Sequence, residues 1–355
     1  MKKTKNILIF LGILVLTVVI IAGCKVGSEV GVATATTLIG TVEISTEAGE
    51  SVGAATTQIE AEESESVGTV AVIVGGLDAP WASFLFGSIV DGLKEGGAEV
   101  MMMDAQWDPA IQNTLVDDAI ASDVDLIAIY PIDPLAVIPA LKKAYDAGVP
   151  VMPFNIKAAP EGDQYIIGFS GIDLYNQAQV AIKLIADAIG GEGNLAIVEG
   201  TPGSSVSIEF IAAVTDYIKD NNLNIKIVAS QPTDWSVEEG TKVAEDFLTR
   251  YKDLDAIFAF DDYLASGVKI ALEEAGYKPG EIKLVGINGC SPGINLIKQG
   301  WMYGTVHQPL VAEGRFEAGR AIEFLKTKEK LDPFYEYIIN NPITKENVNE
   351  IVPEF

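Results

Sequence analysis

The amino-acid sequence predicts an α/β protein made of two halves with parallel sheets, and three observations lead to this prediction. Short runs of apolar, β-branched residues alternate with longer segments that have the apolar spacing of helices. The apolar runs lack a polar alternation, which is typical of strands that are covered on both faces of a parallel sheet. The alternation begins again near residues 169–173, so the chain repeats its strand and helix units in a second half.

The first predicted unit, residues 69–97, sets the pattern for the rest. Residues 69–74 form an apolar strand that ends at a pair of glycines, and Pro80 suits the first turn of a helix because its missing N–H would have no partner there. The helix carries an apolar row at four-residue spacing and stops at a second pair of glycines. This row consists of Trp81, Leu85, Ile89 and Leu93.

The loop between this strand and helix, residues 77–81, is a candidate ligand contact. In an open parallel sheet, the loops at the carboxyl ends of the strands line the binding crevice. This loop offers the carboxylate of Asp78 and the indole of Trp81, a combination that suits a carbohydrate, which has polar hydroxyls and an apolar face. Alternatively, Trp81 packs in the core as part of its own helical row.

The later elements repeat the order of strand, polar loop and helix. Asp108 and Asp133 each precede a proline and are predicted to cap the following helices. Asp173 is a further predicted cap, and Ser236 with Glu239 has the spacing of a capping box. Strands are predicted at 99–103, 126–130, 149–154, 194–199, 225–229, 255–260, 283–288, 303–308 and 335–339. The helices between them are predicted to end near residues 148, 189, 221, 250, 276 and 326.

Two stretches of the second half have more than one interpretation. Residues 200–205 are rich in Gly and Ser and precede a helix, which predicts a tight turn, although their N–H groups could also hold an anion. Asp261 and Asp262 are adjacent at the end of a strand, and at least one of them is expected to be a helix cap or a solvated end.

The first residues resemble a bacterial lipoprotein signal. Lysines precede the apolar run 7–22, which is short for a membrane span but suits a signal peptide core. The run ends in Ile21-Ala22-Gly23-Cys24, which resembles a lipobox and implies that residues 1–23 are removed, that Cys24 is lipidated and that the protein is held on the outer face of a membrane. A plain signal anchor is the alternative. Residues 24–68 have no aromatic side chain and no sustained period, which predicts a disordered, acidic tether.

Composition and motifs exclude several functions. The net charge of −26 argues against nucleic-acid partners, because phosphate contacts need clustered Lys and Arg. No phosphate-binding glycine motif and no nucleophile elbow occurs, and His307 is the only histidine, so multi-histidine metal sites are excluded and a Ser-His-Asp triad could form only around that residue. Cys290, in an apolar context, is predicted to be a small core residue. The sequence therefore predicts no cofactor, no metal and no catalytic residue, although its carboxylates are numerous enough for a glycosidase pair.

Eight short strings resemble, in the same order, those of the type I periplasmic sugar-binding proteins, the ribose-binding-like receptors of ABC importers. Each string is weak alone, and their shared order extends the resemblance over residues 69–355. The strings are Asp78–Trp81, Asp104–Pro109, Tyr130-Pro131, Gly148–Val151, Ser230–Trp235, Ala259–Asp262, Val285–Gly289 and Pro342–Asn347.

The resemblance implies the periplasmic binding protein type I fold, in which two doubly wound parallel-sheet lobes are joined by a three-segment hinge. The chain would cross between the lobes near residues 169–172, 308–309 and 338–341. Residues 69–170 plus 309–338 would form the N-terminal lobe, and residues 171–308 plus 339–355 would form the C-terminal lobe.

The resemblance also assigns ligand-binding residues. Trp81 and Trp235 would stack on opposite faces of a sugar ring. Asp261 and Asn288 would form hydrogen bonds from the second lobe, and Gln308 would reach the ligand from the hinge. The other expected ligand-binding residues are Asp78, Gln106, Tyr130 and Asn155, with Trp107 as a neighbour of the cleft.

Two positions depart from the ribose-binding pattern. Ribose-type pockets usually place arginines where this chain has Ile156 and, by alignment, Ile208. The loss of both donors argues against ribose itself. Because Asp78 and Asp261 would then face few cations, the pocket should disfavour sugar acids and phosphates.

The resemblance implies a receptor without enzymatic activity, which acts as a monomer, binds a neutral monosaccharide or polyol and delivers it to the membrane permease of an ABC importer. The alternatives are a receptor for another small cyclic ligand, such as a nucleoside, a signalling furanose or a cationic amine, and a chemosensory binding protein. A glycosidase of the cell envelope is an alternative from a different class, which turnover of aryl glycosides would reveal.

Overall fold

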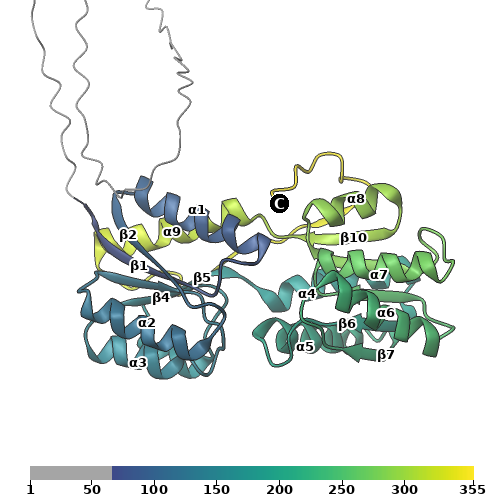
Figure 1. Cartoon of the computed structure of the whole chain (residues 1–355), viewed down its shortest axis with the longest axis horizontal. Helices are drawn as coiled ribbons and strands as arrows, with labels where there is room; N and C mark the ends of the chain where they lie inside the picture. The colour runs from purple at the N-terminus through teal and green to yellow at the C-terminus, as the bar shows by residue number, and fades with distance from the viewer. Residues whose placement is uncertain (1–65) are drawn as a thin grey trace, which may run out of the picture. The chain divides into compact units, whose positions relative to one another are not determined.

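The computed structural model describes residues 66–355, which contain two six-stranded sheets with helices on their faces (Figure 1). The first sheet has the order β11-β5-β4-β3-β1-β2, and every neighbouring pair in it is parallel. The second has the order β12-β10-β9-β8-β6-β7, in which only β12 is antiparallel to its neighbour. The predicted α/β class with doubly wound parallel sheets is confirmed.

The first sheet and its helices form the first lobe. Its elements are β1 (Gly68–Val74), α1 (Pro80–Glu95), β2 (Ala98–Asp104), α2 (Pro109–Ala121), β3 (Leu126–Ile129), α3 (Ile138–Asp146), β4 (Val151–Asn155), the 3-10 helix η1 (Pro160–Tyr165), β5 (Phe169–Ile172), α9 (Leu310–Thr327) and β11 (Tyr335–Ile338). Helix α9 lies beside α1, where Gly314 lets the two backbones approach, because a Cβ there would lie 2.7 Å from the carbonyl oxygen of Leu85.

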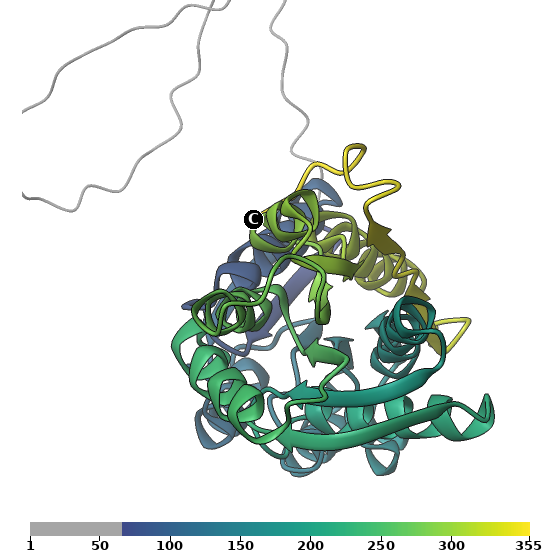
Figure 2. The same cartoon turned by 90° about the vertical axis from the view of Figure 1, so that its right-hand side faces the viewer.

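The second sheet and its helices form the second lobe. Its elements are α4 (Leu174–Ile189), β6 (Glu192–Val198), α5 (Ser205–Asp220), β7 (Asn224–Gln231), α6 (Val237–Arg250), β8 (Ala256–Ala259), α7 (Asp262–Glu274), β9 (Lys283–Asn288), α8 (Ser291–Gln299), β10 (Met302–His307) and β12 (Pro342–Thr344). The chain passes between the lobes after β5, after β10 and after β11, and the side view in Figure 2 shows the second lobe in front of the first.

Several helix ends follow the predicted chemistry. The carboxylates of Asp108 and Asp173 accept hydrogen bonds from backbone N–H groups in the first turns of α2 and α4. Gly96 caps α1. Only half of the predicted capping box forms, since Ser236 accepts from the N–H of Glu239 at 3.1 Å while the Glu239 carboxylate pairs with Lys242 instead of returning to the cap.

The predicted start of the third helix is wrong. Asp133 accepts from the N–H groups of Leu135 and Ala136 at 2.8 Å each, but these close a turn, and α3 begins only at Ile138. Helix α8 and the three-residue strand β12 were not predicted. Gly68, assigned to the tether, already pairs with Ala98 in the first sheet.

The predicted signal peptide, the lipidation of Cys24 and residues 24–65 of the tether lie outside the described residues. Within residues 66–355, none of the helices has the length and apolar character needed to cross a membrane.

Candidate functional site

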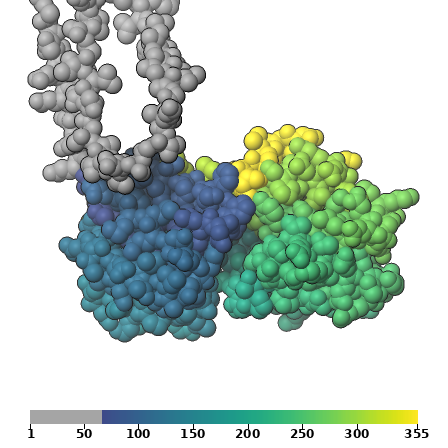
Figure 3. Space-filling model, in the orientation of Figure 1, coloured from purple at the N-terminus to yellow at the C-terminus, as the bar shows by residue number. Residues whose placement is uncertain are grey.

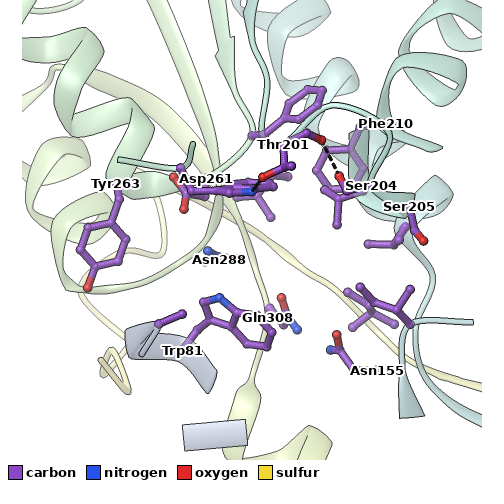
Figure 4. A pocket seen from close by; sticks show the side chains of 18 of the residues that line it. Trp81, Asn155, Thr201, Ser204, Ser205, Phe210, Asp261, Tyr263, Asn288 and Gln308 are labelled. Atoms are coloured by element: carbon purple, nitrogen blue, oxygen red, sulfur yellow. Dashed lines mark hydrogen bonds between the residues drawn. The ribbon is translucent and has the colours of Figure 1, made fainter. Parts of the chain in front are cut away.

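A cavity of about 640 Å³ lies between the lobes, and side chains from both line it. The space-filling view shows the first lobe, in purple and blue, separated from the green second lobe by a cleft (Figure 3). The volume falls within the range typical of small-molecule sites. In the close-up of Figure 4, Trp81, Asn155 and Gln308 lie on one side of the cavity, opposite Thr201, Asp261 and Phe210.

The first lobe contributes a cluster of aromatic rings. The ring of Trp81 lies 5.9 Å from the rings of both Trp107 and Tyr130. Trp107 fits against the end of β1 because Gly76 has no side chain, and a Cβ there would lie 2.3 Å from the indole nitrogen. That nitrogen donates a hydrogen bond to the Asp78 carboxylate at 2.5 Å, so ring and carboxylate hold each other at the cavity wall.

The second lobe fixes Trp235 in a comparable way. Its indole nitrogen donates to the hydroxyl of Thr201 at 2.9 Å, and its backbone N–H donates to the hydroxyl of Thr233 at 3.1 Å. The ring lies directly over Gly200, where a Cβ would come within 1.8 Å of it. Trp235 is half-buried and has a left-handed backbone with φ of 71°. The side chain is therefore held in place by its own lobe.

Asp261 is a buried carboxylate that both caps a helix and faces the cavity. Its Oδ1 accepts from the N–H of Leu264 in the first turn of α7 at 2.7 Å. The residue is only 7% exposed, and burial raises the pKa of its carboxyl to about 7. At neutral pH this carboxyl is thus close to its titration midpoint.

The neighbouring Asp262 lies inside the second lobe and does not line the cavity. It is completely buried, where it accepts hydrogen bonds from the Thr305 hydroxyl at 2.8 Å and from the Cys290 N–H at 3.0 Å. Asp261 is the predicted helix cap, and both carboxylates are buried, so neither is a solvated helix end. Cys290 is buried, and burial raises the pKa of its thiol above the usual range.

Three of the amide side chains expected to bind the ligand are part of the polar lining, to which Gln177 of α4 adds a fourth amide. Asn288 has φ of 104° at the end of β9, a left-handed backbone that Asn tolerates better than most residues. Asn155 ends β4 and Gln308 follows β10, and both donate to the buried Glu313 carboxylate, at 2.6 and 2.9 Å. The second sheet also holds Gln308 through its backbone N–H, which donates to the carbonyl oxygen of Asn288 at 3.0 Å.

Most of the expected ligand-binding residues come together at the cavity. Its lining includes Asp78, Trp81, Trp107, Tyr130, Asn155, Trp235, Asp261, Asn288 and Gln308. Gln106 does not line it, because its backbone turns at φ of 53° and leaves the side chain exposed.

The alignment that placed Ile208 at the cavity is wrong. Ile208 is 58% exposed on α5, whereas Ser205, Val206 and Phe210 line the cavity from this helix. Ile156 does line the cavity, and the lining contains no arginine.

Several lining residues were missed by the sequence analysis. Thr201 and Ser204 come from the loop between β6 and α5, Ser205 and Tyr263 come from the first turns of α5 and α7, and Gln177 comes from α4. The loop lies at the carboxyl end of a parallel strand, which is a general signal for ligand contact, but its composition had favoured a tight turn.

The lining is acidic. It contains the carboxylates of Asp78, Asp234 and Asp261 and no Lys, Arg or His. The described residues hold no group of acidic, His or Cys side chains suited to a metal ion. A phosphate or carboxylate ligand would therefore meet no compensating charge here.

Two lobes with parallel sheets and a polar and aromatic cavity between them define a two-lobed small-molecule binding protein. The family model described as periplasmic binding protein domain matches residues 70–325. The chain belongs to this family, and the resemblance to type I periplasmic sugar-binding proteins is confirmed.

Individual relatives agree with this assignment. A ribose import binding protein of Bacillus subtilis is 29% identical over 74% of this chain and 83% of its own length. A xylitol-binding protein of Mycolicibacterium smegmatis is 29% identical over 72% of this chain and 71% of its own length. The crystal structure of a solute-binding protein of an ABC transporter from Actinobacillus succinogenes with bound D-allose matches with a TM-score of 0.72 at 26% identity, over 80% of this chain and 99% of the other.

Proposed function

We propose that this protein is a substrate-binding lipoprotein of an ABC importer, which binds a neutral monosaccharide or polyol between its lobes and delivers it to the permease. The observation that carries the proposal is the lining of the cavity. It combines indole rings from both lobes with carboxylate and amide groups, and it has no cation. Hydroxyl groups can donate to these acceptors, while the C–H faces of a sugar ring pack against indole.

The two lobes would close on the ligand as on a hinge. Trp81 belongs to the first lobe and Trp235 to the second, so a ligand that touches both stabilises the closed state. The crossings after β5, β10 and β11 would be the hinge segments, with residues 69–170 plus 309–338 and residues 171–308 plus 339–355 as the moving bodies. No catalytic step is required.

The proposal places the mature protein at the bacterial cell envelope. Cys24 would carry the lipid, and residues 24–65 would connect it to the folded part, which acts as a monomer. The names of the relatives, which include ribose import and xylitol-binding proteins, support an importer component. The sequence Ile21-Ala22-Gly23-Cys24 supports the anchor.

A ligand that carries an amine is the second candidate. The three carboxylates of the lining have no cation beside them, and an ammonium group between aromatic walls would neutralise part of this charge. Such a ligand would be another small cyclic compound with hydroxyl groups, so it differs from the first candidate in charge and not in size.

Titration calorimetry of the purified folded part, residues 66–355, tests both candidates. The titrants are D-ribose, D-allose, L-arabinose, D-fucose, xylitol, myo-inositol, adenosine and D-glucosamine. Binding of a neutral sugar or polyol with a Kd in the micromolar range or below supports the first candidate. Heat from glucosamine alone supports the second, and heat from the nucleoside alone, or hydrolysis of an aryl glycoside, overturns both.

A further inference from the structure

Glu313 lies behind the cavity, outside its lining, and contacts two residues that line it. The residue is in the first turn of α9, directly after the chain passes between the lobes, and it is completely buried. Its Oε1 accepts from Nδ2 of Asn155 at 2.6 Å, and its Oε2 accepts from Nε2 of Gln308 at 2.9 Å. One carboxylate therefore contacts both amides.

These two hydrogen bonds fix which atom each amide turns to the cavity. An ionised carboxylate can only accept, so the NH₂ groups of Asn155 and Gln308 must face Glu313. Their carbonyl oxygens are left on the opposite side. Figure 4 shows both oxygens on the side toward Phe210 and Thr201, and both nitrogens on the far side. Neither oxygen accepts a hydrogen bond from a residue within 66–355.

A second buried carboxyl one turn along α9 supports the ionised state of Glu313. Oε1 of Glu317 accepts from the backbone N–H of Asn155 at 2.7 Å, and the residue is completely buried. Burial and the charge of Glu313 together raise the pKa of Glu317 well above its ordinary value. Glu317 is thus the member of the pair that holds its proton more tightly. Glu313, whose own pKa burial raises to about 7, ionises first, and two N–H donors stabilise its charge.

We propose that Glu313 is a specificity-determining residue that acts through Asn155 and Gln308: it holds both amides with their oxygens toward the cavity. This inference rests on the proposed function and adds a requirement to it. The ligand must donate two hydrogen bonds to this side of the cavity, so two of its hydroxyl or amino groups cannot be replaced by groups that only accept.

The first test uses the wild-type protein and the monodeoxyfluoro analogues of whichever titrant binds. Fluorine has a size near that of hydroxyl but cannot donate. We expect at least two ring positions at which fluorine lowers the affinity about 10-fold or more, consistent with an unpaired buried acceptor. If fluorine is tolerated at every position, the proposal is wrong while sugar binding stands. If none of the titrants binds, the proposed function fails and the inference fails with it.

The second test compares Glu313→Gln with the matched variant Glu317→Gln. A glutamine at 313 turns its oxygen to one of the two amides and its NH₂ to the other, so either Asn155 or Gln308 must turn its own oxygen to residue 313 and its NH₂ to the cavity. We expect weaker binding of the parent ligand and the loss of the fluorine penalty at one of the two positions. Glu317→Gln keeps an acceptor for the Asn155 N–H and should retain both penalties. An equal loss of affinity for all analogues in Glu313→Gln would reduce Glu313 to a structural role.

Discussion

At the scale of single residues, the cavity side chains are held by their own lobes before a ligand binds. Asp78 accepts from the indole of Trp107, and Trp235 donates to Thr201. Because each group is already ordered, little conformational entropy remains to be lost on binding. Each lobe therefore presents its part of the binding site in an ordered conformation.

The indole of Trp235 is expected to contribute a large part of the binding free energy. We expect Trp235→Ala to weaken binding about 30-fold or more, because the apolar face of the ligand loses its partner in the second lobe. Trp235→Phe should recover part of the affinity. Calorimetric titration measures the loss, and a cooperative thermal melt shows that the fold persists. Tyr145→Ala, which changes a ring that is 56% exposed, is the control. Unchanged affinity in Trp235→Ala would assign the ring to packing alone.

Asp261 is expected to make ligand affinity depend on pH. Burial raises the pKa of this carboxyl to about 7, and hydroxyl donors from a ligand favour its ionised form. Affinity for a neutral sugar should therefore rise between pH 6 and pH 8. In Asp261→Asn, affinity should be lower and this part of the pH dependence should disappear, while the Asn oxygen still accepts from the N–H of Leu264. A variant with an unchanged slope would show that another group titrates.

Eight of the nine residues predicted to bind the ligand line the cavity, but the sequence did not show how each is held. The resemblance to the family was sufficient to place Trp81 and Asn155 at positions that line the cavity. The expectation for Ile208 was wrong, because a helix turns by 100° per residue and this residue lies on the exposed face of α5. Phe210 lies on the buried face of α5 and Ile208 on the exposed one.

At the scale of elements, the site depends on close approach between loops at the ends of strands. The loop after β6 passes under the ring of Trp235 at Gly200, and the end of β1 lies against Trp107 at Gly76. These glycines make room for rings in loops that are distant along the chain. A side chain at either position would move an indole away from the cavity wall.

The Gly200→Ala variant tests this arrangement. The added methyl group would lie 1.8 Å from the Trp235 ring, so the ring or the loop must shift. We expect affinity to fall about 10-fold or more. Gly319→Ala in α9 is the matched control, because the new Cβ has open space around it and alanine favours the helix. It should keep full affinity and melt at an equal or higher temperature. If Gly200→Ala binds like wild type, the position of the ring is not what limits affinity.

The sequence predicted the start of a helix correctly where the N-cap residue decides it. Asp108 and Asp173 cap α2 and α4 because a carboxylate at the N-cap satisfies free N–H groups in any context. Asp133 forms the same bonds, but the chain continues as a turn before α3 begins. Strand β12 has three residues and pairs antiparallel with β10. Three residues are too few to show the pattern by which a strand can be recognised in the sequence.

At the scale of the whole molecule, buried carboxyls and a large negative charge should make stability depend on pH. Burial raises the pKa of Asp261 and Glu313 to about 7 and that of Asp262 to about 8, whereas these groups titrate near pH 4 in an unfolded chain. Between these values the folded state binds more protons than the unfolded state. The stabilising contribution is therefore complete below about pH 4 and is lost as the pH rises through 7 to 8.

Differential scanning calorimetry of the protein without ligand tests this prediction. We expect the melting temperature to be at least about 3 °C higher at pH 5.5 than at pH 8. The net charge of −26 acts in the same direction through surface repulsion, which salt screens. The part due to buried carboxyls should remain in 0.5 M NaCl. A melting temperature that rises with pH in high salt would contradict the assignment of protonated carboxyls to the folded state.

The sequence by itself determined the fold class, the repetition of strand and helix units and the eight strings that mark the family, because apolar period, capping and loop chemistry act over a few residues. The tertiary structure decided which polar atoms face the ligand. Asn155 meets Glu313, which lies 158 positions further along the chain, only because the chain leaves the second lobe after β10 and packs α9 against the first sheet. A contact over such a distance has no local signature, so the orientation of these amides could come only from the folded chain.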